Sequence, residues 1–214
     1  MALIVGGKEV PCDVPVHNWT EHGMKFSVGK GGRARKKKVK NITLHWTAGE
    51  GDGKKVYMVL NSRKLGIGFH IDPKGVVTQF SDPLEVATFG QGVINDFSEG
   101  IEMSNYAFGK VQDSHRPIHE QILKGHKIKV ADFYDAQMHS MVALVTALCN
   151  ALDIPKVIPG KDGKFLAEGL TMPQMNEYAG VNGHINIPGT TKVDPGLQPF
   201  DVLLKNGFTI KEIK

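Results

Sequence analysis

Long apolar runs are missing from this 214-residue chain, and cysteine is scarce. No segment approaches the roughly 18 consecutive apolar residues that a membrane-spanning helix needs, so we expect no membrane span. Cys12 and Cys149 lie far apart in the sequence and form no metal-type or redox-type spacing. This argues against a disulfide framework and predicts two buried free thiols.

The N-terminus also lacks the pattern of a secretory leader. Its apolar run stops at Val5, and no basic stretch precedes it. We therefore expect no signal peptide and synthesis in the cytoplasm, so that an action outside the cell would require a separate means of release.

Aromatic residues make up only 7% of the chain, and none is interleaved with its main basic run. That run gives much of the net charge of +4 and consists of Lys30, Arg33, Arg35, Lys36, Lys37, Lys38 and Lys40. This run is either a solvent-exposed segment that leads into the next strand or a segment that attracts a polyanion. Base stacking would need aromatic side chains, so an anionic cell-wall polymer is favoured over nucleic acid, and we expect no nucleic-acid partner.

Alternating and helical patterns predict one domain with a mixed sheet. Strands are expected in 41–47, on both sides of a turn at 73–75, and in 100–105, and an N-terminal hairpin around Gly6 and Gly7. A short helix is expected over 53–63. The clearest helix follows Asp132, which could cap it, and ends before Pro155.

The remaining segments show weaker patterns. Residues 110–130 have no trusted periodicity, and 156–181 read as a loop-rich insertion with a turn of helix near "MPQMNEY". The fold class is therefore α/β (α+β), a single domain with a central mixed β-sheet flanked by helices. Within it, we expect residues 1–40 to form an extension packed on a catalytic domain of 41–214.

Chemically capable side chains stand opposite apolar neighbours in three predicted strands. They are His45, His70 and Glu102. A lone histidine in a strand is more often a hydrogen-bonded core or surface residue than a ligand. The segment "GHINIPGTTKVDPG" changes this balance, because His184 and Asp194 bracket a loop whose Asp-Pro-Gly turn would aim the carboxylate.

A catalytic zinc ion takes three protein ligands and leaves a fourth position for water. His45, His184 and Asp194 would meet that count. Glu102 and Lys192 are of the types that move a proton and stabilise an oxyanion. The alternative from the residues alone is a structural protein with buried histidines and no metal.

Five blocks in order carry a family resemblance: "ITLHWTAG", "GFHIDPKGVVTQF", "INDFSEGIEMSN", "DAQMHSMVALVTALCNALDIP" and "GHINIPGTTKVDPG". Together they resemble the zinc-dependent N-acetylmuramoyl-L-alanine amidases of the amidase-2 type, a family that includes animal peptidoglycan recognition proteins. The blocks span about residues 41–196. Any one of them alone would be a weak signal.

The resemblance implies roles for particular residues. The metal ligands would be His45, His184 and Asp194, with Lys192 on the oxyanion and Glu102 as the acid/base. Some phage members use a tyrosine where this chain has Phe69, which favours Glu102. Candidate substrate contacts are Thr47, Asn95 and His70, the last as a supporting or substrate-facing residue rather than a ligand.

Two departures from the family pattern stand out. Many relatives have a histidine ahead of the glutamate strand, where this chain has Phe89 or Gly90. The closing loop also has Ile185 and Asn186 in place of polar or acidic residues. Neither change touches an expected ligand.

The implied function is cleavage of peptidoglycan between N-acetylmuramic acid and L-alanine, in a phage or prophage endolysin that acts on the wall after release. We expect a monomer with peptidoglycan as its partner. The alternatives are a cytoplasmic muropeptide-recycling amidase, a non-catalytic peptidoglycan-binding module, and a metallohydrolase for another amide.

Overall fold

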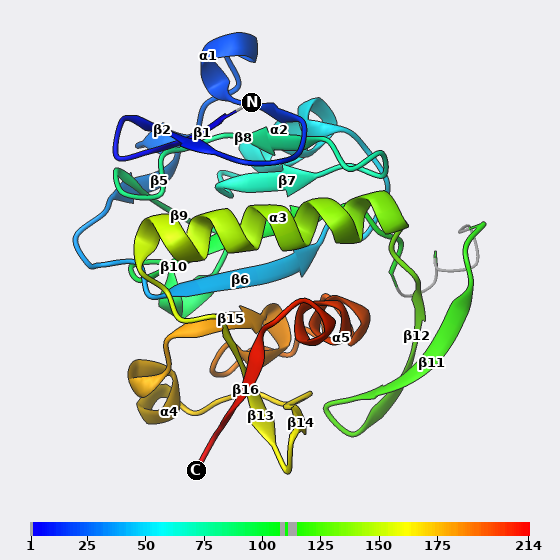
Figure 1. Cartoon of the computed structure of the whole chain (residues 1–214). Coiled ribbons are helices and arrows are strands. Elements are labelled where there is room, and N and C mark those ends of the chain that lie inside the picture. Colours follow the sequence, from blue (N-terminus) through cyan, green and yellow to red (C-terminus); the bar gives the residue numbers. More distant parts are fainter. Residues whose placement is uncertain (1, 108–109, 111–114) are drawn as a thin grey trace.

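The computed structural model describes residues 2–107, 110 and 115–214, and a six-stranded mixed sheet forms the centre of this part (Figure 1). Four neighbouring strands run parallel, the fifth runs antiparallel to them, and the sixth is parallel to the fifth. In spatial order they are β15 (Gly180–Gly183), β6 (Asn41–Trp46), β10 (Ser98–Met103), β7 (Phe69–Ile71), β8 (Val77–Gln79) and β3 (Val16–His17). The α/β prediction with one central mixed sheet is confirmed.

Strand β6 is buried along its whole length. It lies between β15 and β10, and layers of chain cover both faces of the sheet, as is usual for parallel strands. On one face, Leu44 and Ile101 join the main core with Met141 and Leu144 of the long helix α3 (Asp135–Leu152). The other face carries the polar side chains of the same strands.

On that polar face a row of three side chains crosses the sheet. Glu102 on β10 is in register with His45 on β6 and with His70 on β7. The row continues to Thr78 on β8, where helix α2 (Gly53–Ser62) approaches closely. A Cβ on Gly53 would come within 2.3 Å of the Thr78 hydroxyl oxygen, so only glycine allows this approach.

Helix α3 confirms the clearest helical prediction, but Asp132 does not cap it. The N-cap is Tyr134, whose backbone N–H donates to the side chain of Gln137 at 3.2 Å. The Asp132 carboxylate instead pairs with His119 at 3.0 Å. The helix ends where Asp153 adopts a left-handed conformation, two residues before Pro155.

The predicted hairpin around Gly6 and Gly7 is present as β1 (Ala2–Val5) and β2 (Lys8–Pro11). Both glycine amides donate to the Asp82 carboxylate. The predicted turn between β7 and β8 is also present, where Asp72 accepts hydrogen bonds from the turn amides. The first turn is therefore held by a distant carboxylate and the second by a local one.

Two segments contain structure that the sequence did not predict. Residues 118–131 form an antiparallel hairpin of β11 (Ile118–Leu123) and β12 (His126–Ala131), which extends along one side of the molecule (Figure 1). The expected loop-rich insertion contains strands β13 (Val157–Lys161) and β14 (Lys164–Phe165), which form a sheet with the C-terminal β16 (Thr209–Glu212). The expected turn of helix is α4 (Met172–Glu177).

Strands of the first 40 residues pair with strands from the rest of the chain. Strand β3 joins the central sheet, and β5 (Gly31–Ala34) pairs with β4 (Ser27–Val28) and β9 (Val86–Thr88). Other short helical segments are α1 (Trp19–His22), α5 (Gln198–Lys205) and the 3-10 turn η1 (Gly92–Ile94). A domain boundary at residue 40 stays a prediction.

One member of the basic run is not solvated. The side chain of Arg35 is 2% exposed, and its Nη2 lies 2.8 Å from a carboxylate oxygen of the fully buried Glu99. Burial raises the pKa of Glu99 to about 7, although Arg35 pulls it in the opposite direction. Arg35 therefore anchors the start of β10 rather than attracting a polyanion.

Both cysteines are free and buried, as predicted. Among the described residues, no helix combines the length and the hydropathy that crossing a membrane would require.

Candidate metal and catalytic site

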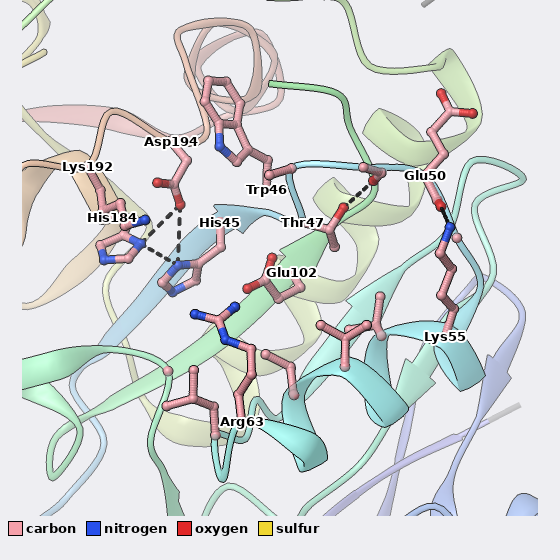
Figure 2. Close-up of a pocket in the computed structure, with 18 of the residues that line it drawn as sticks. His45, Trp46, Thr47, Glu50, Lys55, Arg63, Glu102, His184, Lys192 and Asp194 are labelled. Atoms are coloured by element: carbon pink, nitrogen blue, oxygen red, sulfur yellow. Dashed lines mark hydrogen bonds and ion pairs between the residues drawn. The ribbon is translucent and has the colours of Figure 1, made fainter. Parts of the chain in front are cut away.

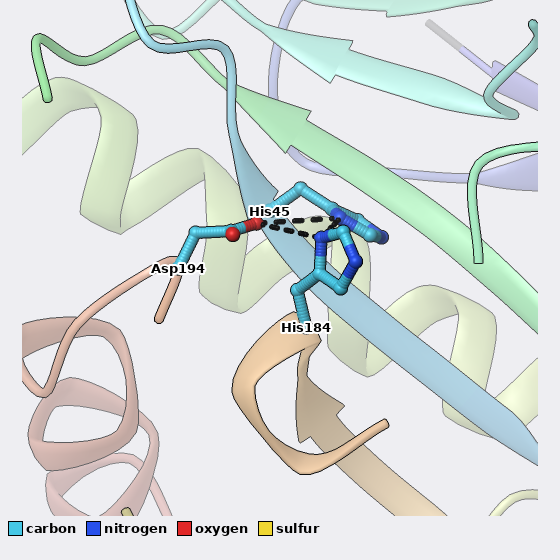
Figure 3. A group of neighbouring side chains, drawn as sticks. All are labelled: His45, His184 and Asp194. Carbon is cyan, nitrogen blue, oxygen red and sulfur yellow. Dashed lines mark hydrogen bonds and ion pairs between the residues drawn. The ribbon is translucent and has the colours of Figure 1, made fainter. Parts of the chain in front are cut away.

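Three ligand-type atoms converge at the end of β6 (Figure 3). The Nδ1 atoms of His45 and His184 lie 2.9 Å apart, and an Asp194 carboxylate oxygen lies 3.4 Å and 3.1 Å from them. His45 and Asp194 are buried, and His184 is half-buried. Among the described residues, this is the one group of at least three His, Cys, Asp or Glu side chains close enough to hold a metal ion.

The closing loop, residues 184–196, brings two of these side chains to the sheet. His184 starts the 3-10 turn η3 (His184–Asn186) directly after β15, which pairs with β6. The Ile185 amide then donates to the carbonyl of Asp194 at 3.0 Å, which folds the far end of the loop back. The chain connectivity therefore places His184 and Asp194 beside His45.

The two unusual residues of the closing loop have structural roles. Ile185 is buried in the main core. Asn186 accepts from the Gly183 amide at 2.9 Å and donates to the carbonyls of Leu166 and Glu168. These bonds fix the loop where relatives would have other residues.

The donor set fits zinc. Two imidazole nitrogens and one carboxylate oxygen are a common catalytic ligand set, and bonds of about 2.0–2.1 Å require tetrahedral ligand atoms roughly 3.3 Å apart. Burial lowers the pKa of His45, which favours the neutral, ligating imidazole. Burial alone would raise the pKa of Asp194, but hydrogen bonds with His184 and His45 outweigh it and hold that pKa below its ordinary value.

Glu102 stands next to this group and lines the same pocket (Figure 2). One of its carboxylate oxygens is buried and has no hydrogen-bond partner among the described residues. Burial raises the pKa of Glu102 well above its ordinary value, and Asp194 adds to this, while Arg63 and Lys192 pull it down. A carboxyl group in this setting can hold a proton near neutral pH.

The pocket runs between α2 and the closing loop. Helix α2 contributes Val56, Val59 and Leu60 as an apolar wall, and Lys192 lies exposed at the opposite side. Lys55 and Arg63, which the sequence analysis missed, line the helix side as well (Figure 2). The i+3, i+4 spacing of Arg63 with this apolar wall was the signal that could have found it.

The candidate substrate contacts are placed differently from one another. Thr47 lines the pocket, and its hydroxyl donates to the carbonyl of Gly49. His70 is fully buried, 3.0 Å from the Ser104 hydroxyl, and burial lowers its pKa to about 3. Asn95 accepts from the Gln91 amide, and neither it nor His70 is among the residues that line the pocket.

The positions where many relatives carry a histidine also reach the site. Phe89 and Gly90 both line the pocket. Phe69, where some relatives have tyrosine, is fully buried in the core instead. Of these positions, Phe89 and Gly90 line the pocket, and neither has an imidazole group.

Comparison with known proteins gives a consistent result. The family model for N-acetylmuramoyl-L-alanine amidases (Amidase_2) matches residues 35–197. No curated protein sequence matches the chain.

Solved structures share the fold. The N-acetylmuramoyl-L-alanine amidase LysC from Clostridium intestinale is 15% identical, with a TM-score of 0.52 over 79% of this chain and 85% of LysC. The amidase AmiD from E. coli, solved with a muropeptide substrate, is 20% identical, with a TM-score of 0.54 over 81% of this chain and 59% of AmiD. Drosophila peptidoglycan recognition protein SD is 14% identical, with a TM-score of 0.55 over 94% of this chain and all of that protein (100%).

Proposed function

Because the chain belongs to the N-acetylmuramoyl-L-alanine amidase family, we propose that it is a zinc-dependent peptidoglycan hydrolase. It cleaves the amide that joins the lactyl group of N-acetylmuramic acid to L-alanine of the stem peptide. The observation that carries this proposal is the convergence of His45, His184 and Asp194 within 3.4 Å of one another, beside Glu102 in one pocket.

The zinc ligands are His45, His184 and Asp194. Bound zinc supplies Lewis-acid polarisation of a carbonyl and increases the acidity of water. The buried surroundings favour a neutral His45 imidazole and an ionised Asp194 carboxylate, which are the states needed for ligation.

Glu102 is the acid/base. Its carboxylate takes a proton from the attacking water as the new C–O bond forms, and gives that proton to the alanine nitrogen as the C–N bond breaks. The products are the lactyl carboxylic acid, which releases its remaining proton to solvent and becomes the carboxylate, and the free alanine amine. Burial raises the pKa of Glu102, which makes its carboxylate a stronger base for taking the proton of the attacking water.

Lys192 stabilises the negative charge that develops on the carbonyl oxygen. It is exposed at the pocket edge, two residues before Asp194, so its ammonium group can reach bound substrate. Thr47 lies on the opposite side of the pocket and is the retained candidate for substrate contact (Figure 2).

A catalytic role is favoured over a non-catalytic binding module, although peptidoglycan recognition proteins share the fold. All three ligand positions and the acid/base position hold competent side chains. We further propose an endolysin role over muropeptide recycling, supported by the fold shared with the endolysin amidase LysCS from Clostridium intestinale. In that role the protein acts on the wall as a monomer.

Digestion of purified peptidoglycan tests the proposal. New alanine amino termini and new reducing sugar ends are scored with and without a zinc chelator. Chelator-sensitive alanine ends without sugar ends are expected. A zinc-loaded protein that binds peptidoglycan but produces neither kind of new end would support the non-catalytic binding module. Cleavage only of amides that are not part of peptidoglycan would support a metallohydrolase for another amide.

A further inference from the structure

The β11–β12 hairpin contacts both loops that border the catalytic pocket. Its start lies against the loop of residues 47–51, which follows β6, and its turn lies against the closing loop. The hairpin strands themselves are not among the described residues that line the pocket. Their contacts therefore act on the pocket only through the two loops.

At the start of the hairpin, Arg116 binds two residues near the pocket. Its Nη2 donates to the Glu50 carboxylate at 2.7 Å and to the Asn105 side-chain oxygen at 2.9 Å. The Arg116 side chain is 6% exposed and the Glu50 side chain is 26% exposed, so the arginine side of this pair is shielded from water and the carboxylate side is partly open to it. Asn105 also donates to the carbonyl of Ala131, which ties the base of the hairpin to the same loop region.

At the turn, Lys124 binds the closing loop directly. Its ammonium group donates to the carbonyl of Thr190. The Thr190 hydroxyl in turn accepts from the backbone amide of Lys192 at 3.1 Å. The backbone amide of Lys124 donates to the carbonyl of Ala167, which fixes the turn against the body of the protein.

Between these ends, the inner face of the hairpin packs on the far part of the closing loop. Gln121 accepts a hydrogen bond from the Leu197 amide at 3.0 Å. A Cβ on Gly196 would meet this same Gln121 oxygen at 3.0 Å and a Val130 methyl at 3.2 Å, so the two segments are in close contact. Val130 also shares one core with Val193 of the closing loop.

The middle of the closing loop is the part that needs such support. Asn186 anchors its start through two backbone carbonyls, and the Leu197 amide anchors its far end on the hairpin. Residues 189–192 lie between these anchors and are largely exposed. Among the described residues, the Lys124 ammonium group is the side chain from outside the loop that bonds to this stretch.

We propose that Lys124 and Gln121 are positioning residues for the zinc site, and that the β11–β12 hairpin holds Lys192 and Asp194 in place. Lys124 and Gln121 each form a hydrogen bond with the backbone of the closing loop or its continuation, and the Lys124 ammonium group also attracts the Asp194 carboxylate through space. The inference rests on the proposed zinc site, because it assigns the hairpin a role in forming it.

The test compares Lys124→Met with Lys127→Met. Lys127 lies on the same hairpin, but its ammonium group makes an exposed pair with Glu120, so it is the matched control. The measurements are the zinc dissociation constant by chelator competition, kcat and KM on muropeptide, the melting temperature, and amide hydrogen exchange of residues 185–197.

Lys124→Met is expected to weaken zinc binding by about tenfold, the lower end of the range for residues that support metal ligands. We expect kcat to fall while KM and the melting temperature change little, and exchange to increase in the closing loop. Lys124→Arg should restore most of the zinc affinity, and Lys127→Met should match the parent protein. Gln121→Met provides a second variant with the same expected direction.

Zinc affinity of Lys124→Met equal to that of Lys127→Met, or no recovery in Lys124→Arg, would overturn the proposal. Failure of the proposed function gives a different result. If the parent protein binds zinc but releases no alanine ends, the zinc constants still decide the role of Lys124. If the parent protein binds no zinc, unchanged amide hydrogen exchange of the closing loop in Lys124→Met would overturn the proposal that Lys124 holds this loop in place.

Discussion

The two sides of the candidate site are held in different ways. His45 and Glu102 come from neighbouring central strands, where the sheet register fixes their spacing. His184, Lys192 and Asp194 come from the closing loop, which depends on single hydrogen bonds such as those from Asn186 and Lys124. The strand side is thus fixed by many cooperative contacts and the loop side by a few replaceable ones.

Removing the loop-side histidine should have the largest effect. His184→Ala leaves two ligands, so we expect loss of stoichiometric zinc and, with the metal, loss of most of the activity. Zinc per chain after gel filtration measures this. His139→Ala, at an exposed histidine on α3, is the control, and a fully metallated His184→Ala protein would remove His184 from the ligand set.

Glu102→Gln tests the strand side. The amide has nearly the shape of the carboxyl group but cannot accept the proton, so activity should fall by about 10²–10⁴-fold. Zinc content should stay at the parent level, in contrast to His184→Ala. Glu120→Gln on the exposed hairpin is the control. Near-parent turnover in Glu102→Gln would exclude Glu102 as the acid/base.

Lys192→Met should cost about 10²-fold in kcat, comparable to the loss of one oxyanion donor. Because the Lys192 side chain is exposed and is not one of the ligands, zinc affinity and stability should be unchanged. Steady-state kinetics on a soluble muropeptide separates kcat from KM. A change in KM alone would make Lys192 a binding residue.

The smallest effect concerns stability of the strand side. Burial raises the pKa of Glu99 to about 7, so the folded protein binds this proton more tightly than the unfolded chain does. The resulting stabilisation is complete below about pH 4.5 and is lost as pH rises through about 7, by up to about 3 kcal/mol. Glu99→Gln should flatten this dependence.

The free energy of unfolding is measured with urea at about pH 5 and about pH 7.5, because most of the expected loss of stability falls between these two values. The change between the two pH values is then compared for the parent protein and Glu99→Gln. Glu85→Gln, at an exposed position, is the control. If the parent protein and Glu99→Gln change in parallel between these two pH values, Glu99 does not titrate in this range.

Most of the strand side could be predicted from sequence. Alternation in 41–47 and 100–105 marked β6 and β10 and placed His45 and Glu102 on the less apolar face. It could not show that these residues are cross-strand neighbours, because register depends on pairing between distant segments. In the closing loop, the residue types alone showed only which side chains could be metal ligands. The family resemblance indicated which of them would bind the same metal ion.

The missed elements have physical explanations. The β11–β12 hairpin is exposed on most of its length, so its residues carry no alternating apolar pattern. Asp132 looked like a helix cap, but its carboxylate pairs with His119 and the helix starts three residues later. Arg35 resembled its solvated neighbours in sequence and was distinguished only by the distant Glu99.

The position of β15 at the end of the central sheet has a consequence for how the molecule resists degradation. His184 follows this edge strand directly, and His45 lies on the strand next to it. Separating β15 from β6 would therefore break the proposed zinc site before the rest of the sheet opened. Bound zinc would oppose that separation by mass action, so a protease present in a bacterial lysate would cut the metal-loaded protein near residue 184 more slowly than the metal-free protein.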